Sequence, residues 1–141
     1  MPTLPWTTGR VPDPGAEVLV LGSRLELAHY RDVPGFLIAA MKIRKQVRHS
    51  GGAIGVSLIA QPARKTFWTL SAWTDQQALE AFVGARPHRD VMEKFHDRLL
   101  DTGFETWTMA AAGLPEKNSN AKDLWRHARD RLRAGAMEGV Q

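Results

Sequence analysis

The chain has 141 residues, of which 43% are hydrophobic, and its five tryptophans and five phenylalanines predict one globular domain with a substantial core. It contains no cysteine, which excludes disulfide frameworks, thiolate zinc sites and cysteine nucleophiles. The net charge of +4 is spread over residues 44–48 and 122–133 rather than gathered in a motif, so we interpret these basic residues as solvated helix faces and expect no nucleic-acid partner.

No apolar run approaches the roughly 18 residues that are needed to span a bilayer. The first residues also lack the basic start and apolar core of a secretory signal. Together with the absence of cysteine, which fits a reducing compartment, these features lead us to expect a cytoplasmic protein with no membrane partner.

The first 16 residues contain four prolines and two glycines, which predicts an irregular N-terminal arm. Trp6 in this arm is expected to pack on its own domain or on a partner subunit. Residues 17–30 then predict a long strand, one face of which we expect to be buried under helices: Leu19, Leu21, Ser23, Leu25 and Leu27. Ser23 is the polar member of this row, so it is either hydrogen-bonded in the core or exposed to a pocket.

A helix is predicted from about Pro34 to Arg48. Asp32 is a candidate cap and Pro34 suits the first turn. The apolar residues follow each other at spacings of four, three and four, which is a helical stripe: Phe36, Ala40, Ile43 and Val47.

Two strands are predicted over residues 53–61 and 66–73, and the short connection between them indicates an antiparallel hairpin. In the first, one face should carry Ile54, Val56, Leu58 and Ala60. In the second, Trp68 and Trp73 are five residues apart, so a period of two places them on opposite faces. Only one of them can therefore line a pocket on the helix side of the sheet.

Thr74 and Asp75 follow the hairpin, and either can cap a helix. Two helical pieces are predicted next, one before Pro87 and one after it. A further strand covers residues 103–112, with Trp107 and Met109 on one face. A closing helix is predicted over about 118–133, with N-cap candidates at 118, 119 and 120.

The order β-α-β-β-α-β with an added helix predicts an α+β fold: a ferredoxin-like sandwich with helices on one face of an antiparallel sheet. We expect the arm over 1–16, the ferredoxin-like domain over 17–112 and a C-terminal helical extension over 113–141. The second sheet face carries Val18, Val20, Trp107 and Met109. Because these are apolar, we expect a second sheet to pack on them, most simply from a homodimer.

The segment TFWTLSAWTDQQALEAFVGARPHRDVM, residues 66–92, resembles the antibiotic-biosynthesis-monooxygenase-like proteins of the dimeric α/β barrel superfamily. The matching features are a strand that ends in Trp73, the acidic cap Asp75, Ala78 with Leu79, the aromatic Phe82, and a turn of small residues that leads to His88. The resemblance covers about residues 17–109 and implies a homodimeric α/β barrel. Its members include cofactor-free oxygenases, haem-degrading enzymes and proteins of unknown role, so it implies the fold more strongly than the reaction.

The haem-degrading branch of this superfamily uses an asparagine, a tryptophan and a histidine at positions that match Ser23, Phe82 and Met92 here. All three depart from that pattern. We therefore expect no cofactor, with haem held by His88 or His96 as the alternative. The cofactor-free branch uses an asparagine, a tryptophan and an arginine or tyrosine to hold a phenolic substrate near dioxygen. Here Trp68 or Trp73 and Arg44 supply part of that set, but no asparagine lies on the core strands.

The leading hypothesis is a cofactor-independent monooxygenase-like enzyme that acts on a polycyclic aromatic or other apolar small molecule. His88 and Arg44 are the candidate catalytic residues, handling a proton or an anionic oxygen. For His88 the structural alternative is that it caps the helix or hydrogen-bonds the preceding turn. The candidate substrate-binding residues are Ser23, Trp68, Ser71, Trp73, Phe82 and Met92. The five histidines lack ligand spacing, so we expect no metal site.

The second hypothesis is a non-catalytic dimeric module that binds a small ligand or stabilises a partner. It predicts that Trp73, Phe82 and Met92 pack together on the helix side of the sheet and leave no cavity of ligand size.

Overall fold

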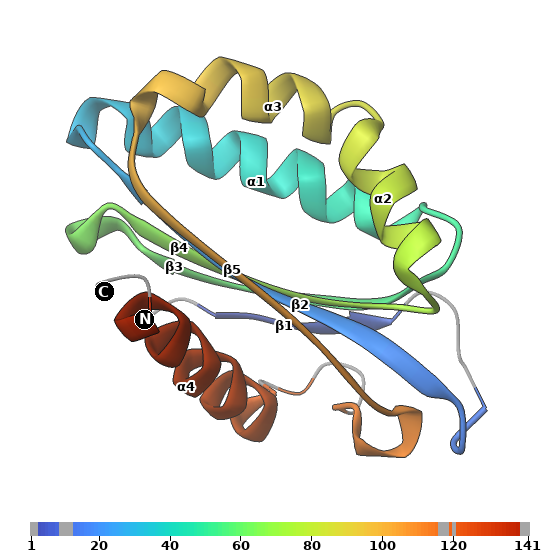
Figure 1. The fold of residues 1–141 in the computed structure, drawn as a ribbon. Coiled ribbons are helices and arrows are strands. Elements are labelled where there is room, and N and C mark those ends of the chain that lie inside the picture. The colour runs from blue at the N-terminus through green and yellow to red at the C-terminus, as the bar shows by residue number, and fades with distance from the viewer. Residues whose placement is uncertain (1–2, 9–12, 116–118, 120, 139–141) are drawn as a thin grey trace.

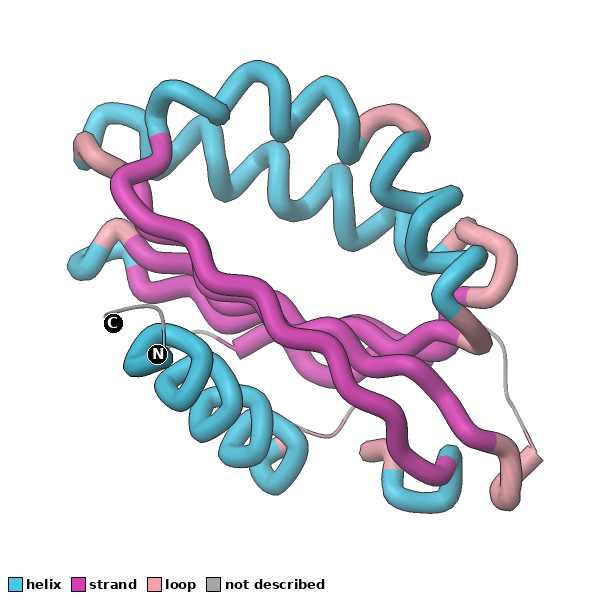
Figure 2. Tube along the Cα trace, viewed as in Figure 1, coloured by secondary structure: helices cyan, strands magenta, loops and turns pink. Residues whose placement is uncertain are grey.

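The computed structural model describes residues 3–8, 13–115, 119 and 121–138. In chain order its main elements are β1 (Thr3–Thr8), β2 (Glu17–Leu27), α1 (Val33–Arg48), β3 (Ala53–Gln61), β4 (Thr66–Trp73), α2 (Gln76–Gly84), α3 (His88–Phe95), β5 (Leu99–Ala110) and α4 (Lys122–Glu138). The strands form one antiparallel sheet in the order β1-β3-β4-β2-β5. Helices α1, α2 and α3 cover one face and α4 covers the other (Figures 1 and 2). The predicted α+β, ferredoxin-like βαββαβ order is confirmed over β2 to β5.

The prediction of an irregular N-terminal arm is wrong for residues 3–8, which form the edge strand β1 against β3. Pro5 is tolerated there because an edge strand leaves some N–H groups unpaired, and the pairing is irregular between Leu4 and Thr7. Trp6 is only 1% exposed, and its backbone N–H donates to the carbonyl oxygen of Ser119 at 2.8 Å. Trp6 therefore packs on its own chain. The N-cap candidates 118 and 120 lie outside the described residues.

The two predicted helix caps differ in outcome. Asp75 has an extended backbone, and its carboxylate accepts from the N–H of Ala78 at 2.8 Å, so it caps α2 as predicted. Asp32 makes no cap hydrogen bond, because it is the last residue of a 3-10 turn and has a helical backbone. Its buried carboxylate instead pairs with Arg98, with Oδ1 2.7 Å from Nη1.

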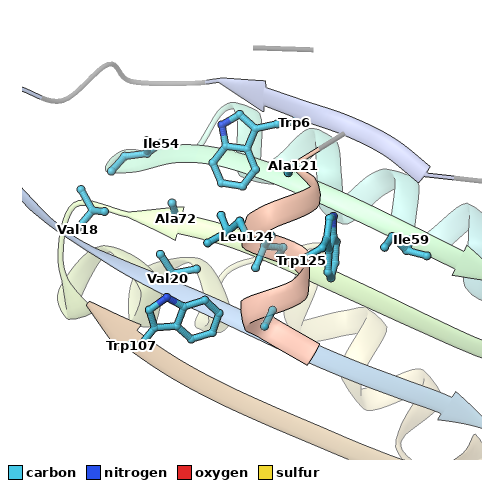
Figure 3. Packing of buried hydrophobic residues seen from close by; sticks show 12 residues of the cluster. Trp6, Val18, Val20, Ile54, Ile59, Ala72, Trp107, Ala121, Leu124 and Trp125 are labelled. Atoms are coloured by element: carbon cyan, nitrogen blue, oxygen red, sulfur yellow. The ribbon is translucent and has the colours of Figure 1, made fainter. Parts of the chain in front are cut away.

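The sheet face beneath α4 holds an apolar cluster that joins the N-terminal strand to the C-terminal helix (Figure 3): Trp6, Val18, Val20, Ile54, Ile59, Leu70, Ala72, Trp107, Ala121, Leu124, Trp125 and Ala128. The indole N–H of Trp125 donates to the hydroxyl of Ser57 at 3.1 Å and ties α4 to β3. This cluster corrects the expectation that a second sheet covers this face, since α4 of the same chain does so. The homodimer itself stays a prediction, and this face is not open to it.

Ile54 also belongs to this cluster, although the alternation in the sequence predicts the opposite face. The register of β3 against β4 shifts between Ala53 and Gly55, and this irregularity reverses the direction of Ile54 relative to Val56. Gly55 follows directly, and a Cβ there would overlap the indole of Trp6. Glycine is thus required at this position by the close approach of β1.

Between the sheet and α1 to α3, two further apolar clusters pack. One contains Leu25, Leu27, Phe36, Ala39, Ala60, Phe67, Val91 and Phe95, and the other contains Val47, Ala53, Val56, Trp73, Leu79 and Phe82. The apolar stripe predicted for α1 is confirmed, because Phe36, Ala40 and Val47 are buried. Its fourth member, Ile43, packs against both clusters. Of the described helices, none is long and apolar enough to cross a membrane.

Candidate functional site

A cavity of about 90 Å³ lies between the helix-side face of the sheet and helices α1 to α3. Its walls come from every strand except β1 and from three helices, and they include members of both helix-side clusters. Most of the lining is apolar. The polar residues among it are Ser23, Arg44, Ser57, Thr69, Ser71 and His88, of which Ser57 turns its hydroxyl away toward Trp125 of α4. Four of these polar residues were predicted site residues, namely Ser23, Arg44, Ser71 and His88. They line the same cavity as two further predicted residues, Phe82 and Met92.

His88 is the first residue of α3, and its ring packs against Phe82 with the centroids 4.9 Å apart. The Nδ1 atom lies 3.1 Å from the carbonyl oxygen of Val83. Because a carbonyl only accepts hydrogen bonds, Nδ1 carries the proton, and in the neutral ring Nε2 keeps its lone pair. Burial lowers the pKa of His88, and the bond to Val83 raises it by less. The neutral ring is therefore favoured, with Nε2 able to accept a proton.

The hydrogen bond to Val83, in the last turn of α2, is the contact that the structural alternative for His88 predicts, whereas the capping role is not seen, because the N-cap position of α3 is Pro87. This contact uses Nδ1. A base would use Nε2, so the two roles are compatible in one imidazole.

Gln46 on α1 holds His88 in place, and sequence reasoning missed it. Its side-chain oxygen accepts from the backbone N–H of His88 at 2.8 Å, and its amide nitrogen donates to the carbonyl oxygen of Phe82 at 3.2 Å. One side chain thus fastens both the end of α2 and the start of α3 to α1. No pattern in the sequence marks this glutamine, because its partners lie about forty residues away and are backbone atoms.

Arg44, also on α1, lines the same cavity. Its Nε atom is buried and has no hydrogen-bond partner among the described residues. None of the ion pairs in the described part of the chain involves it. Burial and the nearby Arg48 both lower the pKa of Arg44, although a guanidinium stays charged at any physiological pH. With no counter-ion among the described residues, this cation at an apolar wall favours an anionic ligand.

Two hydroxyl groups on neighbouring strands complete the polar part of the lining. Ser23 on β2 stands opposite Thr69 on β4, and their hydroxyl oxygens are hydrogen-bonded to each other. Ser71 accepts from the indole N–H of Trp73 at 2.9 Å. Each of these groups keeps further hydrogen-bonding capacity, since a hydroxyl is one donor and two acceptors. Ser23 is thus both hydrogen-bonded and part of a pocket wall.

The two tryptophans of β4 lie on opposite faces, as predicted, but neither belongs to the lining of the cavity. Trp73 is fully buried on the helix side, 4.9 Å from Phe82 between ring centroids, and supports that wall from behind. Trp68 packs against the cluster under α4, and its indole N–H donates to Gln61 at 2.8 Å. Trp68 therefore does not reach this cavity, because strand alternation directs it to the other face.

Phe104 on β5 also lines the cavity, and sequence reasoning did not select it. Together with Met92 it lines a neighbouring surface hollow as well, so these two side chains stand where the cavity meets the surface. Phe104 is 54% exposed. The sheet face on which Phe104 lies could be predicted from the alternation of residues along β5. Its position at the opening of the cavity could not, because that depends on how far α3 extends over the sheet.

The haem alternative does not fit this geometry. Pockets for drug-sized ligands occupy about 300–1,000 Å³, whereas the cavity beside His88 measures about 90 Å³, too small for a porphyrin. His96 is exposed and lines only the surface hollow. In the described part of the chain, no three acidic or histidine side chains are grouped so as to hold a metal ion.

Solved structures with the same architecture include proteins from three bacteria. A candidate monooxygenase from Fusobacterium nucleatum aligns with a TM-score of 0.64 and 10% identity over 82% of this chain and 54% of its own. A candidate antibiotic-biosynthesis monooxygenase from Bacteroides thetaiotaomicron aligns with a TM-score of 0.62 and 15% identity, over 74% of this chain and 100% of its own. SnoaB from Streptomyces nogalater, a cofactor-independent oxygenase, aligns with a TM-score of 0.56 and 12% identity, over 70% of this chain and 98% of its own.

The chain has the fold of the antibiotic-biosynthesis monooxygenases. The resemblance carried by residues 66–92 is thereby confirmed at the level of the fold. This chain spans about half the length of the Fusobacterium protein. No family model matches the chain, and no curated protein matches it in sequence. At 10–16% identity the monooxygenase fold is shared, while the reaction has to be argued from the site itself.

Proposed function

We propose that this cavity catalyses a cofactor-independent oxygenation of a small apolar molecule that carries an acidic C–H group. One observation carries the proposal: His88, a neutral histidine, and Arg44, a cation with no counter-ion among the described residues, line the same mostly apolar cavity. The likeness to SnoaB, a cofactor-independent oxygenase, supports it at the level of the fold.

The first step is proton transfer from the substrate carbon to Nε2 of His88. The substrate becomes an enolate or phenolate, and Arg44 stabilises its negative charge. A cation is most effective for this in a cavity that excludes water, because the low local dielectric strengthens the attraction. The hydroxyl groups of Ser23 and Ser71 orient the anionic oxygen by hydrogen bonds.

The second step transfers electrons from this anion to dioxygen, so no external reductant is needed. The overall balance converts a CH2 group and O2 into a C=O group and water. One oxygen atom stays on the substrate carbon, and the other leaves as water with the two hydrogens of the CH2 group. His88 returns its proton to the departing oxygen.

The size of the cavity restricts the substrate. A cavity of about 150 Å³ is known to hold a benzene ring, and this cavity measures about 90 Å³. A single ring thus requires a modest movement of the lining, and a polycyclic substrate requires Phe104 and Met92 to move away from the mouth. We therefore favour a substrate of one ring over the polycyclic class.

Oxygen uptake by the purified protein tests this proposal, with single-ring 1,3-diketones and an anthrone as the two substrate sizes and a chelator present throughout. We expect uptake by the wild type and a loss of about 10²–10⁴-fold in His88→Gln, the usual effect of removing a general base. His96→Gln is the matched control, since His96 lies outside the cavity. The proposal fails if no substrate raises uptake above buffer, or if both variants behave alike.

The small volume also favours a second candidate, a non-catalytic module that binds a small anion. Trp73 and Phe82 pack together as that hypothesis predicts, although Met92 lines a cavity instead of joining them. This candidate predicts that the same diketones bind in calorimetry, that Arg44→Met weakens the binding, and that no oxygen is consumed.

A further inference from the structure

Strand β5 forms one edge of the sheet, and no described element pairs with its outer side. In Figure 1 it runs across the front of the molecule without a neighbouring ribbon along that side. The strand is 12 residues long. It also carries exposed apolar side chains, with Leu100 at 64% and Phe104 at 54%. A long open edge with exposed apolar residues is a template for pairing with another strand.

We propose that two copies of this chain pair antiparallel through β5, with Phe104 on the two-fold axis. Each copy contributes its five strands to one continuous sheet. The inference does not depend on the chemistry in the cavity. It also differs from a face-to-face dimer, because α4 and Trp6 already occupy the second sheet face.

The register follows from the geometry of antiparallel strands. Residues directly opposite each other turn their backbone N–H groups the same way, and this orientation alternates along a strand. In a pairing of two identical strands, the axis must therefore pass through a residue and not between two. For β5, Leu99–Ala110, the longest overlap places this axis at Phe104 or at Glu105.

Charge decides between these two registers. An axis at Glu105 puts two glutamates directly opposite each other, which destabilises a pair of strands. An axis at Gly103 puts Glu105 opposite Asp101 of the partner subunit, again with like charges. The axis at Phe104 places no two acidic residues opposite each other. It also retains the full 11-residue overlap from 99 to 109, so it is the favoured register.

In this register, residues that stand opposite each other on the helix-side face of the two β5 strands favour strand pairing. Phe104 stands opposite Phe104 of the partner subunit, and Thr102 stands opposite Thr106 of the partner subunit. Aromatic pairs and threonine pairs each stabilise antiparallel strands by roughly 0.2–1 kcal/mol. Asp101 on the opposite face is already paired with Arg24 of its own chain at 3.2 Å.

The pairing bears on the cavity because Phe104 lines it near its mouth. Opposite residues in an antiparallel pair have their Cβ atoms about 4.5–5.5 Å apart. The ring of Phe104 of the partner subunit would therefore lie against the ring of Phe104 and add a second aromatic group at the entrance. Each copy thus helps to close the other's cavity.

Cysteine cross-linking tests the register, because the natural chain has no cysteine. A disulfide needs Cα atoms about 4.4–6.8 Å apart, which suits residues that stand directly opposite each other. We expect Phe104→Cys to form a disulfide-linked dimer under mild oxidation. Thr106→Cys alone should not, since its own copies are four residues out of register, about 13 Å. A mixture of Thr102→Cys and Thr106→Cys should cross-link as heterodimers.

Sedimentation of charge variants gives a second, independent measurement. We expect Phe104→Glu and Phe104→Lys each to weaken self-association by about tenfold or more, and a one-to-one mixture to restore the dimer. Ile38→Lys is the control, because Ile38 is similarly exposed but lies on α1. The proposal is overturned if the wild type sediments as a monomer, if Ile38→Lys dissociates the dimer while Phe104→Glu does not, or if Thr106→Cys cross-links with itself.

Discussion

The imidazole of His88 donates from Nδ1 to the carbonyl oxygen of Val83 across 3.1 Å, so the proton of the neutral ring is held on the last turn of α2. Nε2 is left as the acceptor. Because His88 also lines the cavity, its other nitrogen is the strongest base that the lining offers at neutral pH. The fold thus anchors one ring nitrogen and leaves the other as a hydrogen-bond acceptor within a single side chain.

This relationship predicts a particular dependence of stability on pH. Burial lowers the pKa of His88 in the folded chain from the ordinary value of about 6.5. The unfolded chain therefore binds a proton here at a higher pH than the folded chain does. The stabilising contribution of neutral His88 is complete above about pH 6.5 and is lost as the pH falls through the lowered pKa.

Urea unfolding over a series of pH values measures this contribution. His88→Gln, which cannot titrate, should lose less stability than the wild type between neutral and mildly acidic pH. His96→Gln serves as the control, since His96 is exposed and does not line the cavity. Parallel curves for wild type and His88→Gln would contradict the inferred shift.

Gln46 fastens two backbone groups to α1, and its removal should be costly. Gln46→Leu keeps the volume of the side chain but deletes the bonds to the carbonyl oxygen of Phe82 and the N–H of His88. We expect a loss of about 1–3 kcal/mol in the free energy of unfolding, because partly buried polar groups lose their partners. Gln76→Leu, on an exposed turn of α2, should change stability by less than about 0.5 kcal/mol.

The close approach of Gly55 and Trp6 predicts a coupled pair. Gly55→Ala places a methyl group against the indole and should destabilise the chain by about 1–3 kcal/mol, the usual cost of overpacking. The atoms it meets belong to the part of the indole that phenylalanine lacks. The same substitution should therefore cost less in a Trp6→Phe background.

Thermal or urea unfolding of the four proteins in this cycle measures the coupling. Gly51→Ala is the matched control, because a Cβ at that exposed glycine meets no atom within 4 Å. Additive effects of Gly55→Ala and Trp6→Phe would contradict the contact between β1 and β3.

Periodic features of the fold were predictable from the sequence, because each strand or helix shows its buried face in its own residues. The stripe of α1 and the alternation of β2 are of this kind. Strand β1 was missed because Pro5 and the nearby glycines favour irregular structure locally, and only pairing with β3 makes the segment a strand. The position of α4 was missed for a related reason: an apolar sheet face does not say whether a second subunit or the same chain covers it.

The residues of the candidate site were also only partly predictable from the sequence. His88, Arg44, Ser23, Ser71, Phe82 and Met92 were selected from the sequence, and all of them line one cavity. Trp73 and Trp68 were selected for their size, but the register of β4 places one behind the wall and the other on the far face. Gln46 could not be found, since its role depends on contacts with the distant backbone of α2 and α3.

The most direct test of the central claim is a double-mutant cycle on oxygen uptake with His88→Gln, Arg44→Met and the variant that carries both. If the two side chains act on one substrate in one cavity, each single variant should lose most of the activity, and the double variant should be little worse than the poorer single one. Arg48→Met, which removes a neighbouring cation outside the lining, should retain wild-type uptake. Strictly multiplicative losses, or full activity in Arg44→Met, would contradict the account.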